Sequence, residues 1–159
     1  AFFAQMPSRA QERFLTIREF GAIGNGTSFA MGVAAARPDS KVVLFDGDGS
    51  LLMNIQELET ISRHGMNILI VVMNDGAYGS EVHKLRSEGL AEAGSVFGYA
   101  DFAGIAKGFG LDGHTVTDVA QIAQLVEAFK SSTRGAVWDM RVSDKVVSRI
   151  TRQAHPQRK

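Results

Sequence analysis

The chain has 159 residues, as many acidic as basic side chains, and no cysteine. This length suits one globular domain with its own core, and the balanced charge excludes an overall field that would recruit nucleic acid or an anionic membrane. Without cysteine there are no disulfides, thiolate nucleophiles or zinc–thiolate sites, which agrees with a cytoplasmic location.

The first predicted elements are a helix and two strands. The small residues of SFAMGVAAARP (28–38) predict a close-packed helix that ends near Pro38. The β-branched and aromatic runs at 42–46 and 68–73 predict buried parallel strands. The second run is the longest strongly apolar one, and it is far shorter than the roughly 20 residues that span a bilayer. We therefore expect no membrane-spanning segment.

A second helix is predicted between the two strands. Ile55, Leu58 and Ile61 follow helical spacing. Asn54, followed three residues later by Glu57, has the pattern of a capping box that opens this helix. The predicted order is therefore strand, helix, strand.

The remaining segments continue this alternation. Residues 101–108 predict a helix, residues 113–116 a short strand, and residues 136–142 the last strand. Before the last strand, Asp118 and Gln121 are placed to cap a helix with one apolar face. We therefore predict an α/β fold, a doubly wound parallel sheet with helices on both faces.

The segment after the first strand has some features of a calcium loop. Five oxygen-bearing side chains occupy calcium-binding positions of such a loop: Asp46, Asp48, Ser50, Asn54 and Glu57. However, Leu51 stands where the loop needs glycine for its sharp turn, and a strand precedes it instead of a helix. We therefore reject calcium and assign Asn54 and Glu57 to the helix cap.

A phosphate site fits the same segment better. Ligands of doubly wound sheets bind at the carboxyl ends of the strands, where Gly47, Asp48, Gly49 and Ser50 are expected. The two glycines would let the backbone approach an oxyanion closely. Asp48 would repel that anion unless a hard divalent cation, most simply Mg²⁺, lies between them.

The next parallel strand is expected to supply the missing metal ligands. It ends in Asn74 and Asp75, and the turn at Gly76 can aim the carbonyl oxygen of Ala77 at the same ion. The predicted ligands of Mg²⁺ are therefore Asp48, Asp75 and the Ala77 carbonyl, together with phosphate and water oxygens.

The GDGS motif (47–50) followed by Asn-Asp (74–75) resembles the signature of thiamine diphosphate-dependent enzymes. The segments at 21–39, 100–110 and 136–142 are also similar to the carboxy-terminal diphosphate-binding (PP) domain of acetolactate synthase-like enzymes and 2-oxo acid decarboxylases. The resemblance covers nearly the whole chain, so residues 1–159 are expected to form one thiamine diphosphate-binding domain.

The resemblance implies roles for individual residues. Asp48, Asp75 and the Ala77 carbonyl match the metal ligands, although many relatives have asparagine in place of Asp75. Ile23 matches the apolar residue that wedges between the two cofactor rings. The cofactor contacts that the resemblance implies are Gly21, Ile23, Gly47, Gly49, Ser50, Gly76 and Tyr78. Of these, Tyr78 either packs over the cofactor or closes the turn.

Glu81 falls where pyruvate decarboxylase-like relatives carry an active-site glutamate. Near a diphosphate and a bound substrate it is a candidate for acid–base catalysis. The alternative is a solvated acid in the first turn of a helix, favoured by the helix dipole. His64, His83 and His114 are expected to be ordinary surface or loop residues.

The implied function is to bind thiamine diphosphate through Mg²⁺ as part of a 2-oxo acid decarboxylase or an acetolactate synthase-like carboligase. In that family the glutamate that activates the cofactor comes from a pyrimidine-binding domain, which nothing in this chain resembles. We therefore expect a fragment or separately encoded subunit that is inactive alone. Its expected partners are the pyrimidine-binding domain or subunit and further copies in a homo-oligomer, with a small 2-oxo acid as substrate.

Two further points stay open from sequence. Gly24 and Gly26 supply part of a nicotinamide-type glycine motif, but Phe29 occupies its close-packing position; the alternative function is a non-catalytic nucleotide- or cofactor-binding module of Rossmann-like fold. Residues 143–159 form a basic tail, which is either a solvated terminus or a contact with another domain.

Overall fold

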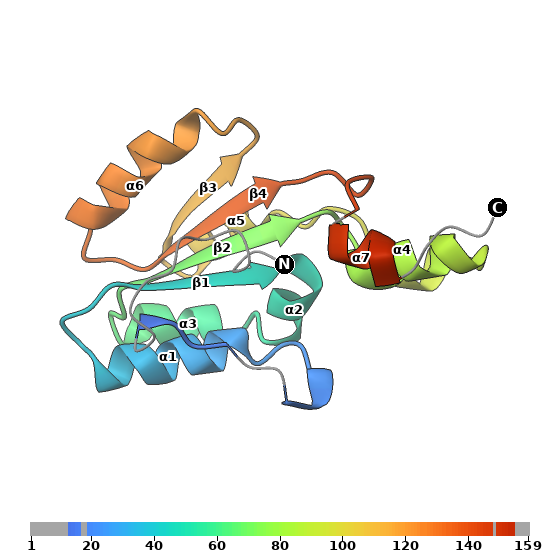
Figure 1. Cartoon of the computed structure of the whole chain (residues 1–159). Coiled ribbons are helices and arrows are strands. Elements are labelled where there is room, and N and C mark those ends of the chain that lie inside the picture. The colour runs from blue at the N-terminus through green and yellow to red at the C-terminus, as the bar shows by residue number, and fades with distance from the viewer. Residues whose placement is uncertain (1–12, 17–18, 148, 155–159) are drawn as a thin grey trace.

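The computed structural model describes residues 13–16, 19–147 and 149–154. Within these residues, a four-stranded parallel sheet has the strand order β1-β2-β4-β3 (Figure 1). The strands are β1 (Val42–Gly47), β2 (Ile68–Asn74), β3 (Asp112–Val116) and β4 (Ala136–Arg141). All four lie where the sequence predicted strands.

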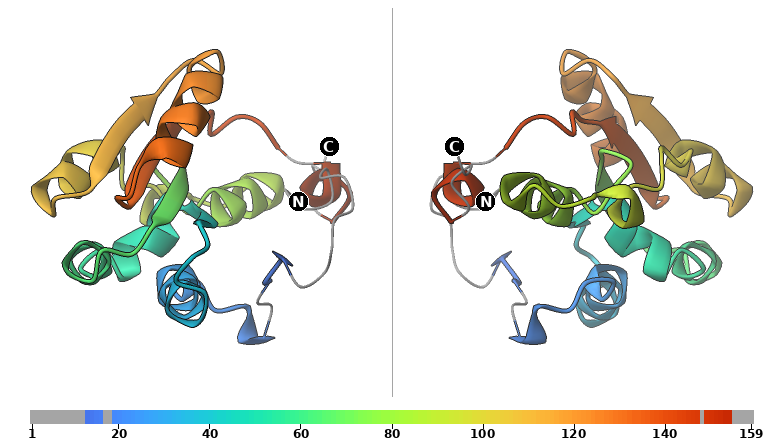
Figure 2. Two further views of the ribbon diagram at one scale, coloured as in Figure 1. Left: turned by 90° about the vertical axis from the view of Figure 1, so that its left-hand side faces the viewer. Right: turned by 90° about the vertical axis from the view of Figure 1, so that its right-hand side faces the viewer.

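Short helices connect the strands and cover the sheet. They are α1 (Gly26–Ala36), α2 (Asp48–Met53), α3 (Glu57–Arg63), α4 (Gly79–Glu88), α5 (Phe102–Gly108), α6 (Gln121–Ser131) and α7 (Arg149–Ala154), with the 3₁₀ helices η3 (Glu19–Gly21) and η4 (Ala93–Ser95). Viewed roughly along the strands, α1 and α3 lie on one side of the sheet and α6 on the other (Figure 2). The predicted α/β fold with helices on both faces is therefore confirmed.

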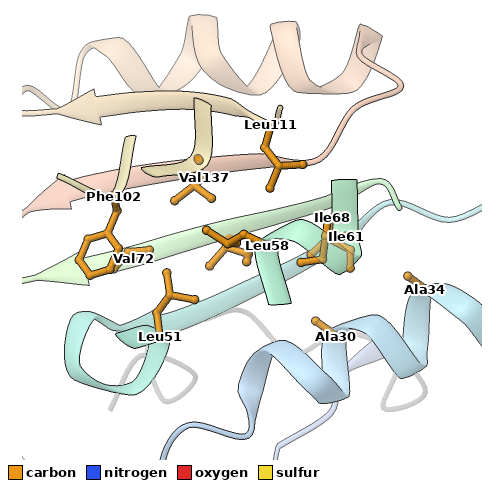
Figure 3. Close-up of a cluster of buried hydrophobic side chains, with 12 residues drawn as sticks. Ala30, Ala34, Leu51, Leu58, Ile61, Ile68, Val72, Phe102, Leu111 and Val137 are labelled. Carbon is orange, nitrogen blue, oxygen red and sulfur yellow. The ribbon is translucent and has the colours of Figure 1, made fainter. Parts of the chain in front are cut away.

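The larger part of the core lies between the sheet and helices α1, α2, α3 and α5 (Figure 3). Its members are Ala30, Ala34, Leu51, Leu58, Ile61, Ile68, Ile70, Val72, Phe102, Ala106, Leu111 and Val137. Phe102, Leu51 and Leu58 are fully buried, and each buried side chain of this size stabilises the fold by roughly 1.5–3 kcal/mol relative to exposure. This cluster fixes α2 and α5 against the carboxyl half of the sheet.

A smaller cluster on the opposite face joins α6 to the sheet. Phe129 of α6 packs with Leu69, Val71, Val116 and Trp138. The alternation of β2 thus divides its side chains between the two faces, as expected for a strand buried on both sides.

The predicted capping box at Asn54 is wrong. Residues 48–53 already form α2, and Asn54 ends that helix; α3 begins at Glu57 with Gln56 at its N-cap and no side-chain cap hydrogen bond. The side chain of Asn54 instead donates to the carbonyl oxygen of Gly24, 30 positions away. A long-range partner has therefore replaced the local cap.

The predicted cap at Asp118 is wrong, because α6 begins at Gln121 with Ala120 at its N-cap and no side-chain cap hydrogen bond. Asp118 lies in the turn before the helix. Its Oδ1 accepts a hydrogen bond from the Ala120 N–H at 2.9 Å, two residues later, and Gln121 Oε1 accepts from the Asp118 N–H at 3.3 Å.

Part of the basic tail is helical. Helix α7 lies beside α4 near the carboxyl edge of the sheet (Figure 1), and Arg149 and Arg152 are exposed. Residues 155–159 of the tail lie outside the described residues. Among the described residues, no helix has the length and apolar character needed to cross a bilayer.

Candidate functional site

Two loops leave the same edge of the sheet, at the carboxyl ends of β1 and β2 (Figure 1). Gly47, the last residue of β1, pairs with Met73 of β2, so the loops emerge side by side. The first passes directly into α2 at Asp48, and the second runs from Asp75 to the start of α4. Ligands of open parallel sheets bind at this edge, and the two predicted metal ligands lie on these neighbouring loops.

Asp48 joins the two loops through hydrogen bonds. Its Oδ1 accepts from the Gly49 N–H and its Oδ2 from the Gly76 N–H, both at 2.7 Å. The residue is only 2% exposed. Burial raises the pKa of Asp48 and the neighbouring Asp75 carboxylate adds to this rise, while the backbone N–H groups of Gly49, Gly76 and Ala77 oppose it. A buried carboxyl group thus spans both loops.

Asp75 supplies a second carboxylate beside the first. Its Oδ1 accepts from the Ala77 N–H at 3.3 Å, and an added Cβ at Gly79 would lie 2.1 Å from its Oδ2, so only glycine leaves room for this side chain at the start of α4. Burial raises the pKa of Asp75; the backbone donors and His83 oppose the rise, and Asp144 adds to it. The carboxylate therefore lies within the first turn of α4.

The donor set fits a hard divalent cation. Asp48 and Asp75 interact as like charges, and burial disfavours the ionised form of each. A cation between them would offset both penalties, and carboxylate and carbonyl oxygens are the ligands that Mg²⁺ prefers. Among the described residues no group of three or more His, Cys, Asp or Glu side chains lies together. Two neighbouring carboxyl groups are thus what the described residues offer at this edge, and the Ala77 carbonyl as third ligand stays a prediction.

A third segment, residues 95–99, covers the second loop. The carbonyl oxygen of Gly76 accepts from the N–H groups of Phe97 at 3.0 Å and Gly98 at 2.8 Å. Gly76 has a φ of 75°, and a Cβ there would lie 3.0 Å from the Gly98 carbonyl carbon. Glycine is therefore required at Gly76 by conformation and by close packing.

Gly49 is in contact with an aromatic ring. A Cβ added at Gly49 would lie 2.4 Å from the ring of Tyr78, which meets Phe97 edge-on with 5.2 Å between ring centroids. We predicted that this glycine lets the backbone approach an oxyanion. The structure gives a second reason for glycine here, because the Tyr78 ring occupies the space that a side chain at Gly49 would need.

The turn before α1 lies against α2. Gly24 is buried, and its N–H donates to Ser50 Oγ at 2.9 Å while its carbonyl accepts from Asn54. The neighbouring Ile23 is 50% exposed, and Gly21 has a φ of 61°. The structure thus brings the Gly21–Ile23 turn to the helix that follows the GDG motif.

Burial raises the pKa of Asp46 at the end of β1, while the Ser50 side chain and the Gly47 N–H lower it. The Ser50 hydroxyl oxygen accepts from the Gly24 N–H. The residues described before α1 form the 3₁₀ helix η3 and not a strand, which disagrees with a nicotinamide-type glycine motif at Gly24 and Gly26.

Glu81 and the histidines occupy the surface or its margin. Glu81 lies in the first turn of α4 with an exposed side chain, and its acid–base role stays a prediction. His64 and His114 are exposed, as predicted, whereas His83 is half-buried beside the Asp75 loop.

Sequence reasoning missed a buried polar network behind the site. Asp139, fully buried in β4, accepts from Asn74 Nδ2 and from Arg141, both at 2.7 Å. Asn74 and Arg141 each also donate to the Ala100 carbonyl at 3.1 Å. The available signal was an acid and a base two positions apart within the apolar strand AVWDMRV.

Known proteins share both the sequence and the fold. A family model described as the C-terminal TPP-binding domain of thiamine pyrophosphate enzymes matches residues 1–140. The acetolactate synthase isozyme 1 large subunit of Escherichia coli is 41% identical over 109 residues, which cover 67% of this chain and 19% of that protein. The acetolactate synthase large subunit of Parasynechococcus marenigrum is 37% identical over 101 residues, 62% of this chain and 16% of that protein.

A solved structure gives the same architecture. The thiamine diphosphate-dependent 4-hydroxybenzoylformate decarboxylase of Rhodococcus jostii matches with a TM-score of 0.68 and 24% identity, over 76% of this chain and 23% of that one. This likeness establishes the fold. The chain spans about a fifth of the length of the relatives it matches.

Proposed function

Because the chain belongs to the thiamine pyrophosphate enzymes, through their C-terminal TPP-binding domain, we propose that it binds the diphosphate of thiamine diphosphate through Mg²⁺. The observation that carries this proposal is the bridge made by Asp48 between the loops that follow β1 and β2, with Asp75 beside it. Asp48, Asp75 and the main-chain carbonyl of Ala77 would hold the metal ion.

The diphosphate would contact the main chain of the GDGS segment. Gly47 precedes α2 at its N-cap, Gly49 and the backbone of Ser50 lie in the first turn of α2, and Gly76 shapes the facing loop. Tyr78 would keep Gly49 in place from the side, and Gly21 and Ile23 would meet the rings of the cofactor. When bound, thiamine diphosphate supplies a nucleophilic carbon for chemistry on a carbonyl substrate.

We propose a 2-oxo acid as that substrate and a decarboxylase or an acetolactate synthase-like carboligase as the whole enzyme. Both activities occur among the similar proteins, as an acetolactate synthase and a 4-hydroxybenzoylformate decarboxylase. Glu81, exposed near the second loop, is the candidate for acid–base catalysis. A pyrimidine-binding domain or subunit would supply the rest of the site in a homo-oligomer. We therefore expect no turnover from these 159 residues alone, which an assay of pyruvate decarboxylation checks.

Asp48→Ala tests the proposed site. It removes one carboxylate from the metal and the bridge between the two loops, so Mg²⁺-dependent binding of thiamine diphosphate should weaken by roughly 30-fold or more, as for loss of a buried charged partner. Isothermal titration calorimetry measures this change. Thermal unfolding of the variant shows whether the fold persists.

The matched control is Asp118→Ala. Asp118 also accepts a backbone hydrogen bond, but in the turn before α6, so its loss should leave cofactor affinity unchanged. Equal affinities for the wild-type chain and a folded Asp48→Ala variant would show that the site assignment is wrong.

A further inference from the structure

The turn that carries Ile23 is anchored to α2 by close packing at Gly24. Gly24 is buried with a φ of 91°, and a Cβ there would lie 2.9 Å from both Cβ and Sδ of Met53. Glycine alone fits this conformation and this distance. The backbone at Gly24 is therefore in direct contact with the helix that follows the GDG motif.

The side chains of Ser50 in α2 and Asn54 at its C-terminal end hydrogen-bond to the N–H and the carbonyl group of Gly24. Ser50 Oγ accepts from the Gly24 N–H at 2.9 Å, and Asn54 Nδ2 donates to the Gly24 carbonyl. Ser50 and Asn54 are four positions apart, so both face the turn from the same side. A buried main-chain donor and acceptor are thereby satisfied by a helix distant in sequence.

The Ser50 hydroxyl contacts the turn directly. Its oxygen accepts from the Gly24 N–H, 26 positions earlier in the chain. At the end of β1, Asp46 Oδ1 accepts from the Gly47 N–H at 2.9 Å, and the Ser50 side chain lowers the pKa of Asp46 against the rise caused by burial. The Ser50 hydroxyl therefore has a partner within the protein, in the turn before α1.

Ile23 directly precedes the anchored residue and is 50% exposed. A large apolar side chain held at the surface beside a clamped backbone can present a fixed apolar face to a ligand, because the backbone at Gly24 limits its movement. The hydrogen bonds to Gly24 thus restrict the backbone next to Ile23.

We propose that Ser50 and Asn54 are positioning residues that anchor the Ile23 turn for the ring portion of the cofactor. The inference rests on the proposed function, and it divides the segment after β1 into two tasks. The main chain of the GDGS segment and Asp48 serve the metal and diphosphate, while the side chains of Ser50 and Asn54 serve the rings through Gly24.

The test compares thiamine diphosphate, which carries the two rings, with inorganic pyrophosphate, which lacks them. Asn54→Ala should raise the Kd for thiamine diphosphate roughly 3- to 10-fold in the presence of Mg²⁺, as expected for the loss of one hydrogen bond. The Kd for inorganic pyrophosphate with Mg²⁺ should stay within about twofold, since pyrophosphate has no rings. Asn67→Ala is the matched control, because Asn67 Nδ2 also donates to a distant carbonyl, that of Ser132; it should change neither affinity.

A measurement without ligand tests the anchor itself. Ser50→Ala should speed the hydrogen exchange of the Gly24 amide, seen by NMR, without speeding that of the Gly76 amide. Ser131→Ala, which removes a hydroxyl bonded within α6, should leave both amides unchanged. Unchanged exchange at Gly24 in Ser50→Ala would overturn the anchor.

The outcomes separate this inference from the proposed function. Equal loss of thiamine diphosphate and pyrophosphate affinity in Asn54→Ala would overturn the division of tasks. If the wild-type chain bound neither ligand with Mg²⁺, the proposed function and the role toward the rings would both fail. Faster exchange at Gly24 would then support only the structural anchor.

Discussion

Two buried carboxylates define the candidate site. Asp48 is nearly inaccessible and bonded to both loops, whereas Asp75 is half-buried at the start of α4. Burial raises the pKa of each, so the fold holds both in a state that is unfavourable for the anion without a cation. This is the arrangement expected of ligands that gain stability when a metal binds.

Asp75→Asn should therefore have opposite effects on stability and on binding. The raised pKa of Asp75 means that its ionised form is less favourable in the folded than in the unfolded chain. The neutral amide removes this penalty, so the metal-free variant should be more stable at pH 7 by less than about 1 kcal/mol, since the group is partly solvated. Mg²⁺-dependent binding of thiamine diphosphate should weaken, because the ligand set loses a negative charge.

The difference in stability between Asp75→Asn and the wild-type chain should depend on pH. As the pH falls through the folded-state pKa of Asp75, the wild-type carboxylate takes up a proton and the advantage of the variant shrinks. Thermal unfolding in EDTA between about pH 4 and pH 8 measures the difference, with Asp118→Asn as the exposed control. A variant less stable than the wild type at pH 7 would contradict the prediction.

The strands were predictable as elements because each is a short β-branched or aromatic run whose neighbours in sequence break the pattern. The sequence could not place α2, since Asn54 and Glu57 satisfy a local capping pattern that the folded chain does not use. The true partner of Asn54 is a carbonyl 30 positions earlier, and only tertiary structure brings the two together.

The candidate site was predictable in part for the same reason. Asp48 and Asp75 follow consecutive parallel strands, and the carboxyl ends of such strands share an edge. The hydrogen bonds of Asp139 were missed because Asn74 meets it only through the pairing of β2 with β4. The sequence pattern does not show which residues of two strands lie opposite each other.

The network on β4 should be a large contributor to stability. Asp139 is fully buried, and Asp139→Ala would leave the guanidinium of Arg141 and the amide of Asn74 without this partner. Breaking a buried ion pair in this way costs roughly 3–5 kcal/mol. Chemical denaturation of the variant measures the free energy of unfolding.

The control replaces both members of the pair. Asp139→Asn with Arg141→Met nearly keeps the volume and removes both charges, so it should destabilise much less than Asp139→Ala alone. A loss below about 1 kcal/mol in Asp139→Ala would mean that the network contributes little.

In the domain as a whole, the segments of the candidate site lie together at the carboxyl edge of the sheet. The GDGS segment, the Asp75 loop and the anchored Ile23 turn all converge near α2, while α6 covers the opposite face of the sheet. The chain covers only about a fifth of its matched relatives. Under the proposed function its own residues would hold the metal and the diphosphate, and the remaining chemistry would need residues from elsewhere in the enzyme.

The most direct test of this account is a calorimetric titration of the wild-type chain with thiamine diphosphate, first with excess Mg²⁺ and then with EDTA. We predict saturable binding to one site with Mg²⁺ and its loss in EDTA, because two carboxylates would otherwise repel the diphosphate. Binding of equal affinity in EDTA, or none with Mg²⁺, would contradict the account.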